Sequence, residues 1–310
     1  MKVFLTGASG VIGRRVFPLL LNAGHEVTAI ARTTEKRAAL ERMGVKIADV
    51  DLFSRRGLAR AVAGHDAVIN LATHMPRSTA RMLLPGAWWE NDRIRREGSA
   101  NLVDAALAGG VRRFVQESFA PVYPGRADAW IEETVPLQPA MYNRTVVDAE
   151  RSAERFSASG RCGVVLRFAL FYGPDSRFTA EIMRLVRHGL APMPGPPSAF
   201  VSSISHDDAA SAVVSALALS AGAYNVCDDE PVTHREYFAS LAAALGVDPP
   251  RLPPAWATRL FGSAGQILAR SQRISNRKLR DAAGFHPRFP SVREGWYSLS
   301  SERVGEHAFV

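Results

Sequence analysis

The feature that most constrains this chain is a strand, a glycine turn and a helix that follow one another within its first residues. Lys2 to Thr6 is a short apolar run, and an apolar helical pattern begins soon after it. The turn between them allows close backbone packing, and the helix N-terminus presents unpaired N–H groups and a positive dipole end. The segment therefore predicts a site for the phosphates of a dinucleotide. The predicted contacts are Gly7, Ser9, Gly10, Val11, Ile12 and Gly13.

Strand and helix patterns alternate through the first half of the chain, which predicts a parallel sheet with helices on both faces. The run 67–72 is almost continuously apolar, as in a strand buried at the centre of such a sheet. We predict a Rossmann-like α/β fold, a doubly wound parallel sheet with a small C-terminal substrate lobe. Residues 1–170 would form the dinucleotide-binding core. Residues 171–310 would form mainly the substrate lobe, with segments around 201–226 returning to the core.

Composition argues against several classes of protein. The chain has 310 residues, of which 47% are hydrophobic, but no apolar run reaches the roughly 20 residues that span a bilayer. Cys162 and Cys227 lie far apart without ligand-like neighbours, which predicts no metal site and no disulfide, and a cytoplasmic location. The net charge of +8 comes from scattered arginines without interleaved aromatic residues, so we predict a small-molecule substrate and no nucleic-acid or membrane partner.

The residue after the second predicted strand indicates which dinucleotide is bound. His25 to Ala31 alternates as a strand, and Arg32 follows it, with no carboxylate before Glu35. An acidic residue there would bind the ribose 2′-hydroxyl of NAD, whereas a basic residue accommodates the 2′-phosphate of NADP. The sequence therefore favours NADP(H), with NAD(H) as the alternative. The interpretation of Arg32 as an ordinary surface charge also stays open.

Later landmarks add a family resemblance. The spacing G-x-x-G-x-x-G after Thr6, the segment 141–150 around Tyr142 and the segment 167–174 resemble the extended short-chain dehydrogenase/reductase superfamily, in its NAD(P)-dependent epimerase/dehydratase family. The resemblance covers nearly the whole chain. It implies a homodimer through the helix predicted over 91–108, by analogy alone. It also implies cofactor contacts by Tyr142, Asp51, Leu52, Leu71, Ala72, Thr73 and Phe168. Asp49 competes with Asp51 for one of these contacts.

The resemblance breaks down where that family carries its proton-transfer groups. Tyr142 matches the catalytic tyrosine, but the position of the lysine four residues later is Val146. A lysine lowers the pKa of the tyrosine from about 10 and binds the nicotinamide ribose, and valine can do neither. The family's serine stands four residues before a Tyr-Gly pair. Counting back from Tyr123 reaches Phe119, with Ser118 adjacent and pointing the other way on an extended backbone.

Three interpretations of this departure stay open. An oxidoreductase or epimerase acting on a small carbonyl, hydroxyl or sugar-nucleotide-like substrate would use a non-standard proton donor, with Tyr142, Ser118 and His74 as candidates. The chain would otherwise be a cofactor-binding regulator or sensor without turnover, or a non-redox lyase or cyclase on the same scaffold. The candidate substrate-binding residues are His74, Glu117 and Arg273, the last for an anionic or hydroxyl-rich substrate.

Overall fold

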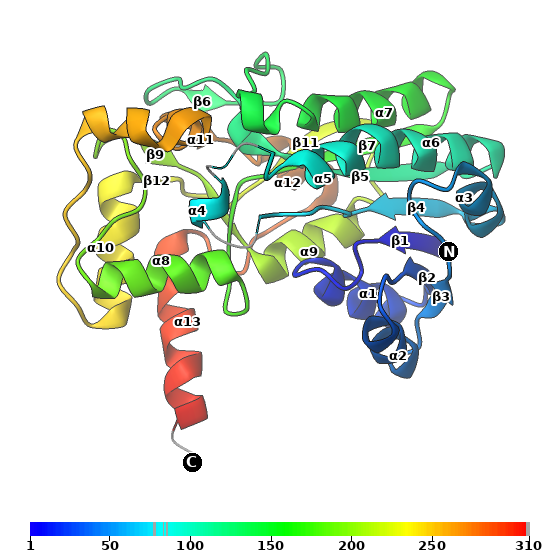
Figure 1. Ribbon diagram of the computed structural model, residues 1–310, viewed down its shortest axis with the longest axis horizontal. Coiled ribbons are helices and arrows are strands. Elements are labelled where there is room, and N and C mark those ends of the chain that lie inside the picture. The colour runs from blue at the N-terminus through cyan, green and yellow to red at the C-terminus, as the bar shows by residue number, and fades with distance from the viewer. Residues whose placement is uncertain (77–78, 83, 85, 308–310) are drawn as a thin grey trace.

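A seven-stranded parallel sheet forms the centre of the molecule, with the strand order β11-β7-β5-β4-β1-β2-β3 (Figure 1). The structure is a computed structural model that describes residues 1–76, 79–82, 84 and 86–307. The order reverses between β1 and β4, so the predicted doubly wound Rossmann-like fold is confirmed. The strands are β1 (Lys2–Thr6), β2 (Glu26–Ile30), β3 (Lys46–Ala48), β4 (Ala67–Asn70), β5 (Arg113–Phe119), β7 (Cys162–Phe168) and β11 (Gly222–Val226).

Helices cover both faces of the sheet because the inner strands are apolar on both sides. In β1, Val3 and Leu5 point into one core cluster and Phe4 points into the other, and all three are fully buried. Each such side chain stabilises the fold by about 1.5–3 kcal/mol. On the first face lie α1 (Gly13–Asn22) and α9 (His206–Ser215), with α2 (Thr34–Arg42) nearby; on the second lie α3 (Arg55–Val62), α6 (Ser99–Ala108) and α7 (Val146–Ala158) (Figure 1).

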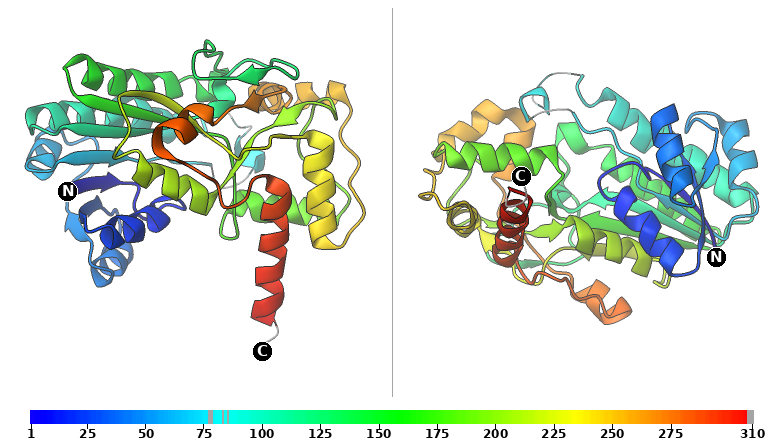
Figure 2. Two further views of the ribbon diagram at one scale, coloured as in Figure 1. Left: turned by 180° about the vertical axis from the view of Figure 1, so that it is seen from behind. Right: turned by 90° about the horizontal axis from the view of Figure 1, so that it is seen from below.

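A smaller lobe is built from the second half of the chain around its own aromatic core. Tyr172, Tyr237 and Trp296 are fully buried there, and the rings of both tyrosines pack against that of Trp296. The final helix projects away from this lobe (Figure 2). Thr233 and Glu236 form a capping box at the start of α10. The helices are α8 (Arg177–Arg187), α10 (His234–Leu245), α11 (Gly262–Leu268), α12 (Arg277–Ala283) and α13 (Val292–His307).

Short strand pairs join this lobe to the core. β8 (Leu170–Tyr172) pairs with β10 (Ser203–Ser205), after which α9 and β11 lie against the central sheet. The other two pairs are β9 (Phe200–Val201) with β12 (Val232–Thr233) and β6 (Trp130–Ile131) with β13 (Arg273–Ile274). In the part of the chain that the structure describes, no helix combines the length and the apolar character that a membrane crossing requires.

Two elements near Tyr142 depend on tertiary context. The helix predicted over 91–108 is divided into α5 (Trp89–Arg93), a π-helical turn (Ile94–Gly98) and α6. Strand β5 extends to Phe119, because its last three residues pair with β7. The sequence gives no sign of that pairing, since the partner strand is about 50 residues away in the chain. A short α4 (Thr79–Met82) precedes α5.

Candidate functional site

The glycine turn lies at the switch point of the sheet, where ligands bind in folds of this kind. Gly7 has φ +73°, and a Cβ added to it would lie 2.3 Å from the carbonyl oxygen of Leu71. A Cβ on Gly13 would lie 2.1 Å from the carbonyl oxygen of Gly7. Neither position accepts a side chain, so the backbone forms a close cradle that fits a diphosphate.

None of the residues of α1 itself places an anion at the start of the helix. No side chain caps the helix at Ile12, and its first turn holds no acidic residue. Ser9 and Gly10 are exposed, and Val11 and Ile12 are half-buried. The amide groups of the turn and the positive end of the helix dipole therefore remain available to a phosphate.

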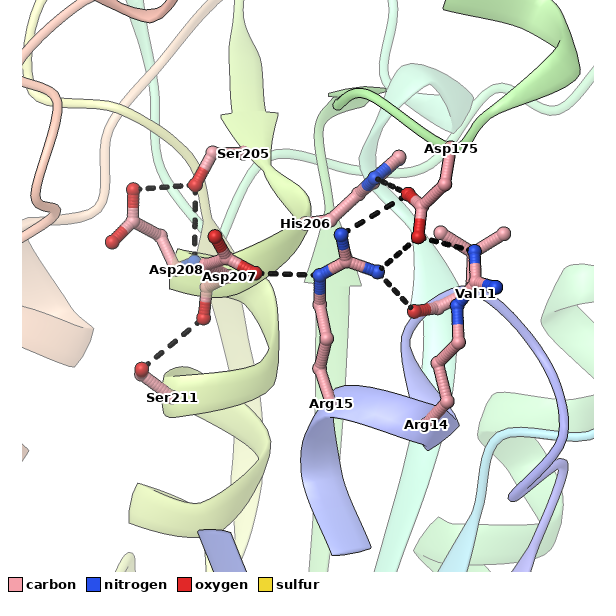
Figure 3. A network of polar contacts seen from close by, with 9 residues as sticks. All are labelled: Val11, Arg14, Arg15, Asp175, Ser205, His206, Asp207, Asp208 and Ser211. Carbon is pink, nitrogen blue, oxygen red and sulfur yellow. Dashed lines mark hydrogen bonds and ion pairs between the residues drawn. The ribbon is translucent and has the colours of Figure 1, made fainter. Parts of the chain in front are cut away.

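A network of ion pairs ties this turn to the second half of the chain (Figure 3). Arg15 donates to the carbonyl oxygen of Val11 at 3.0 Å, to Asp175 at 2.9 Å and to Asp207 at 2.5 Å. Arg14 also pairs with Asp175. His206 lies behind them, with Nδ1 3.3 Å from a carboxylate oxygen of Asp175. Burial lowers the pKa of His206 to about 4, so its ring is neutral at pH 7.

One carboxylate links two of the predicted site residues. Glu90 Oε1 accepts from Nη1 of Arg32 at 3.0 Å and lies 3.5 Å from Nδ1 of His74. The backbone N–H of His74 donates to Asn91 at 2.9 Å. Arg32 is exposed at the end of β2, and Glu90 reaches it from α5. The residue expected to receive a 2′-phosphate is thus held by a neighbouring anion.

Asp49 and Asp51, the two carboxylates that compete for one predicted cofactor contact, have different surroundings. Asp49 pairs with Arg37, whereas Asp51 is exposed and accepts the N–H of Phe53 at 2.8 Å. The carbonyl oxygen of Leu52 accepts from the side chain of Asn101 at 3.1 Å. Of the two, Asp51 is therefore the carboxylate that no arginine among the described residues neutralises.

Hydrogen bonds fix the end of β4, which Leu71, Ala72 and Thr73 follow. Asn70 is buried and accepts from the hydroxyl of Thr6 at 2.6 Å. Its amide group donates to Gln116 at 2.9 Å and to Ser99 at 3.2 Å. These bonds hold β1, β4 and β5 in register at the edge where the predicted cofactor residues lie.

Tyr142 lies at the reaction end of the site, but without the helical geometry that the motif implies. It occupies a single 3₁₀ turn, and Val146 is the first residue of α7 and is fully buried. The ring of Tyr142 packs on that of Trp88 at 5.0 Å. Burial raises the pKa of Tyr142 to about 12, although the charges of Arg95 and Arg270 act against this shift. Its hydroxyl therefore stays protonated near pH 7.

A buried ion pair lies close to that tyrosine. Arg95, in the π turn, places Nη2 3.8 Å from Oε1 of Glu117 in β5. Oε2 of Glu117 is buried and has no hydrogen-bond partner among the described residues. Burial raises the pKa of Glu117, because only one cation compensates its charge. The structure thus brings Glu117 and Tyr142 to the same region through Arg95.

Ser118 faces away from this region. Its fully buried hydroxyl donates to Glu150 at 2.5 Å. Arg167 holds the same carboxylate with two hydrogen bonds, at 2.9 and 2.7 Å, and donates to the hydroxyl of Tyr123 at 2.7 Å. We assign Ser118 a structural role, because its only proton is used inside the core.

Phe119, on the opposite side of β5, lines a pocket between the sheet and the smaller lobe. Arg270 also lines it, whereas Arg273 lies over the rings of Trp130, at 4.1 Å, and Phe200. Phe168 lies in the core with no exposed surface, so we leave it out of the proposed cofactor site.

Sequence reasoning missed three charged residues of this region: Glu90, Arg95 and Arg270. Each acquires its role from a partner far away in the chain or from the π turn, and no local motif marks it. Among the described residues, no three side chains of His, Cys, Asp or Glu are grouped closely enough to hold a metal ion.

Comparisons with known proteins identify a family and a shared fold. The model of the NAD dependent epimerase/dehydratase family matches residues 3–227. A 3-diazoavenalumate denitrifying reductase from a Streptomyces species is 33% identical, over 95% of this chain and 99% of that protein. A 2-alkyl-3-oxoalkanoate reductase from Shewanella oneidensis is 27% identical, over 89% of this chain and 73% of that protein. The solved structure of human epimerase family protein SDR39U1 (isoform2) with NADPH superposes with a TM-score of 0.81 at 21% identity, covering 97% of this chain and 99% of that one.

Proposed function

The chain belongs to the NAD dependent epimerase/dehydratase family, and from this premise we propose that it is an NADP(H)-dependent reductase of small, apolar carboxylic acids. The observation that carries the proposal is the backbone cradle at Gly7 and Gly13, which excludes any side chain. A bound nicotinamide dinucleotide would supply the hydride. The amides of the turn would hold its diphosphate, and Arg32 would receive its 2′-phosphate once Glu90 is displaced.

The state of Tyr142 supports reduction over oxidation. Oxidation of an alcohol needs a base, but burial raises the pKa of Tyr142 to about 12 and Val146 supplies no charge to lower it. A neutral tyrosine can instead donate a hydrogen bond, and then a proton, to the oxygen of a carbonyl acceptor. This direction agrees with the two relatives described above, both of which are named as reductases.

The substrate class is supported by the pocket at Phe119. Its walls are mostly apolar, with aromatic and aliphatic side chains from both halves of the chain. The names of both relatives describe carboxylic acids, an oxoalkanoate and a diazo acid. An apolar acid suits such a pocket better than a nucleotide sugar, whose many hydroxyl groups need hydrogen-bond partners.

A diazo acid is a second candidate substrate, favoured by the loss of the proton relay. Ser118 is committed to Glu150, and Val146 replaces the lysine. A carbonyl that gains a hydride must also gain a proton. An aryl diazonium group that gains a hydride and loses N₂ needs no proton, because the hydride neutralises its positive charge. The reaction would then not require a proton from Tyr142.

A turnover assay with two probe acids tests the proposal. We expect oxidation of NADPH with acetoacetate, an oxo acid, or with 4-carboxybenzenediazonium, measured by the loss of nicotinamide absorbance. Tyr142→Phe should lower the rate with acetoacetate by about 10²-fold and should leave the rate with the diazonium acid nearly unchanged.

Two results would contradict the proposal. Tight NADPH binding without turnover of any acid would favour a sensor, and conversion of a sugar nucleotide without net oxidation of NADPH would favour an epimerase or lyase. The homodimer and the cytoplasmic location stay predictions from the sequence.

A further inference from the structure

The pocket at the end of β5 has mostly apolar walls. It opens beside Phe119, and its walls include Leu170, Phe200, Ile267 and Ile274. Two of its polar lining groups are already used: the side-chain amide of Gln272 donates to the carbonyl oxygen of Tyr123 at 2.6 Å, and the hydroxyl of Ser202 donates to the backbone of Gln272 at 3.1 Å. Arg270 and His234 are the other two polar members.

Arg270 brings an uncompensated positive charge to this pocket. Its Nη1 donates to the carbonyl oxygens of Tyr123 at 2.8 Å and Gln138 at 2.7 Å, which hold the side chain in place. Among the described residues, no carboxylate acts on the charge of Arg270, and its Nε and Nη2 groups make no hydrogen bond. Burial lowers the pKa of Arg270, but arginine stays protonated at any ordinary pH.

Two other arginines near the site differ from Arg270 because each has a carboxylate partner. Arg167 is held by both oxygens of Glu150, and Arg95 pairs with Glu117. Each of these buried guanidinium groups has its own carboxylate within the protein. Arg270 is half-buried in apolar surroundings and lacks one, so an anion from solution would repay part of its desolvation.

His234 provides the second polar point. It is 1% exposed, and its Nδ1 has no hydrogen-bond partner among the described residues. Burial lowers its pKa to about 4, so the ring is neutral at pH 7 and offers a hydrogen bond rather than a charge. A buried polar atom without a partner costs about 1–3 kcal/mol, which a ligand group can recover.

We propose that this pocket binds an aromatic carboxylic acid, with the carboxylate on the free edge of Arg270 and a second polar group of the ligand on Nδ1 of His234. The rings of Phe119 and Phe200 would contact the ligand ring. Arg270 is the one charged residue among the described lining residues, which suits a singly charged carboxylate better than a doubly charged phosphate. The assignment deepens the proposed function, because it names the anchor for the acid of the substrate.

Binding of benzoate to the full-length protein saturated with NADP⁺ tests the anchor. Titration calorimetry should give an affinity for benzoate at least about 10-fold higher than for benzamide, which has the same shape without the charge. Benzoate should also bind more tightly than phenyl phosphate. 4-Hydroxybenzoate should bind more tightly than benzoate, because its hydroxyl group can reach His234.

Variants separate the two anchors. Arg270→Met should lower the affinity for benzoate about 10- to 100-fold and leave that for benzamide unchanged, whereas Arg270→Lys should restore part of it. Arg277→Met, which removes an exposed arginine paired with Glu132, is the matched control and should change nothing. His234→Leu should remove the advantage of 4-hydroxybenzoate over benzoate.

Each contrary result has a defined meaning. Equal binding of benzoate and benzamide to the wild type, tighter binding of phenyl phosphate, or unchanged benzoate binding in Arg270→Met would overturn the carboxylate assignment. If Arg270→Met does not fold, Arg270→Lys and the wild-type ligand pairs still decide the question. If NADP⁺ does not bind, the proposed function fails, and the same titrations on the unliganded protein still test the pocket.

Discussion

The two ends of the predicted cofactor groove differ in how closely they follow the family pattern. At the glycine turn, backbone geometry makes the demands, and Gly7 and Gly13 meet them with no space for a side chain. At the reaction end, the usual lysine position is Val146 and the hydroxyl of Ser118 is bonded inside the core. The chain therefore keeps the backbone geometry of the glycine turn, but not the side chains that the family pattern places at the reaction end.

The largest predicted effect is on stability and concerns the reaction end of the groove. Arg167→Met should lower the free energy of unfolding by about 3–5 kcal/mol, because it leaves the buried Glu150 without its cation. Ser118→Ala should cost only about 1 kcal/mol, as expected for one hydrogen bond. Urea denaturation measures both values. If Ser118→Ala instead abolished turnover without any loss of stability, Ser118 would be catalytic and the comparison would fail.

Restoring the lysine should not restore the family's chemistry. Val146→Lys buries a charge at a fully buried position, so the variant should lose about 3 kcal/mol of stability relative to Val146→Met, a neutral side chain of similar length. The unfolded chain binds the lysine proton more tightly than the folded one. The gap between the two variants should therefore narrow as pH rises from 7 to about 10. A gain in NADPH-dependent turnover by the lysine variant would contradict this account.

The buried His206, which lies beside Asp175 in the ion-pair network at the glycine turn, should make the protein's stability sensitive to acid. His206 has a folded pKa of about 4 against about 6.5 unfolded, so the unfolded state binds more protons between these values. Its contribution of up to about 3 kcal/mol is present above pH 6.5 and is lost as pH falls to about 4. Thermal unfolding across this range should show a shallower loss for His206→Phe. The exposed His188 gives the control, because His188→Phe should reproduce the wild-type curve.

The smallest predicted effect concerns the choice of dinucleotide. Glu90→Gln releases Arg32 and should raise the affinity for NADPH about two- to fivefold, with little change for NADH, because an exposed ion pair contributes at most about 1 kcal/mol. Nicotinamide fluorescence at low salt measures both affinities. Glu97→Gln, which breaks the exposed pair with Arg93, is the matched control. A fall in NADPH affinity would show that Glu90 positions Arg32 rather than competing for it.

The geometry of the glycine turn follows from local sequence. The turn at Gly7 and the arginine after β2 are each read from a few neighbouring residues. The order of strand and helix patterns likewise predicts the parallel sheet.

The reaction end is less predictable because pairing between distant segments decides it. β5 reaches Phe119 only because β7 lies beside it, and this pairing directs Ser118 toward Glu150. Arg95 meets Glu117 because a π turn interrupts the predicted helix. The alternation of an extended strand predicts that Ser118 points away, but no spacing in the sequence encodes its partner Glu150 or the pairing of Arg95 with Glu117.

The central claim, that backbone at the glycine turn binds the dinucleotide, is tested most directly by titrating NADPH into the wild type and Gly13→Ala. We expect saturable binding to the wild type, and a loss of at least about 100-fold in Gly13→Ala, whose Cβ would collide with the carbonyl oxygen of Gly7. Gly98→Ala, where a Cβ meets nothing closer than 3.8 Å, should bind as the wild type does. No binding to the folded wild type, or undiminished binding to a folded Gly13→Ala variant, would contradict the account.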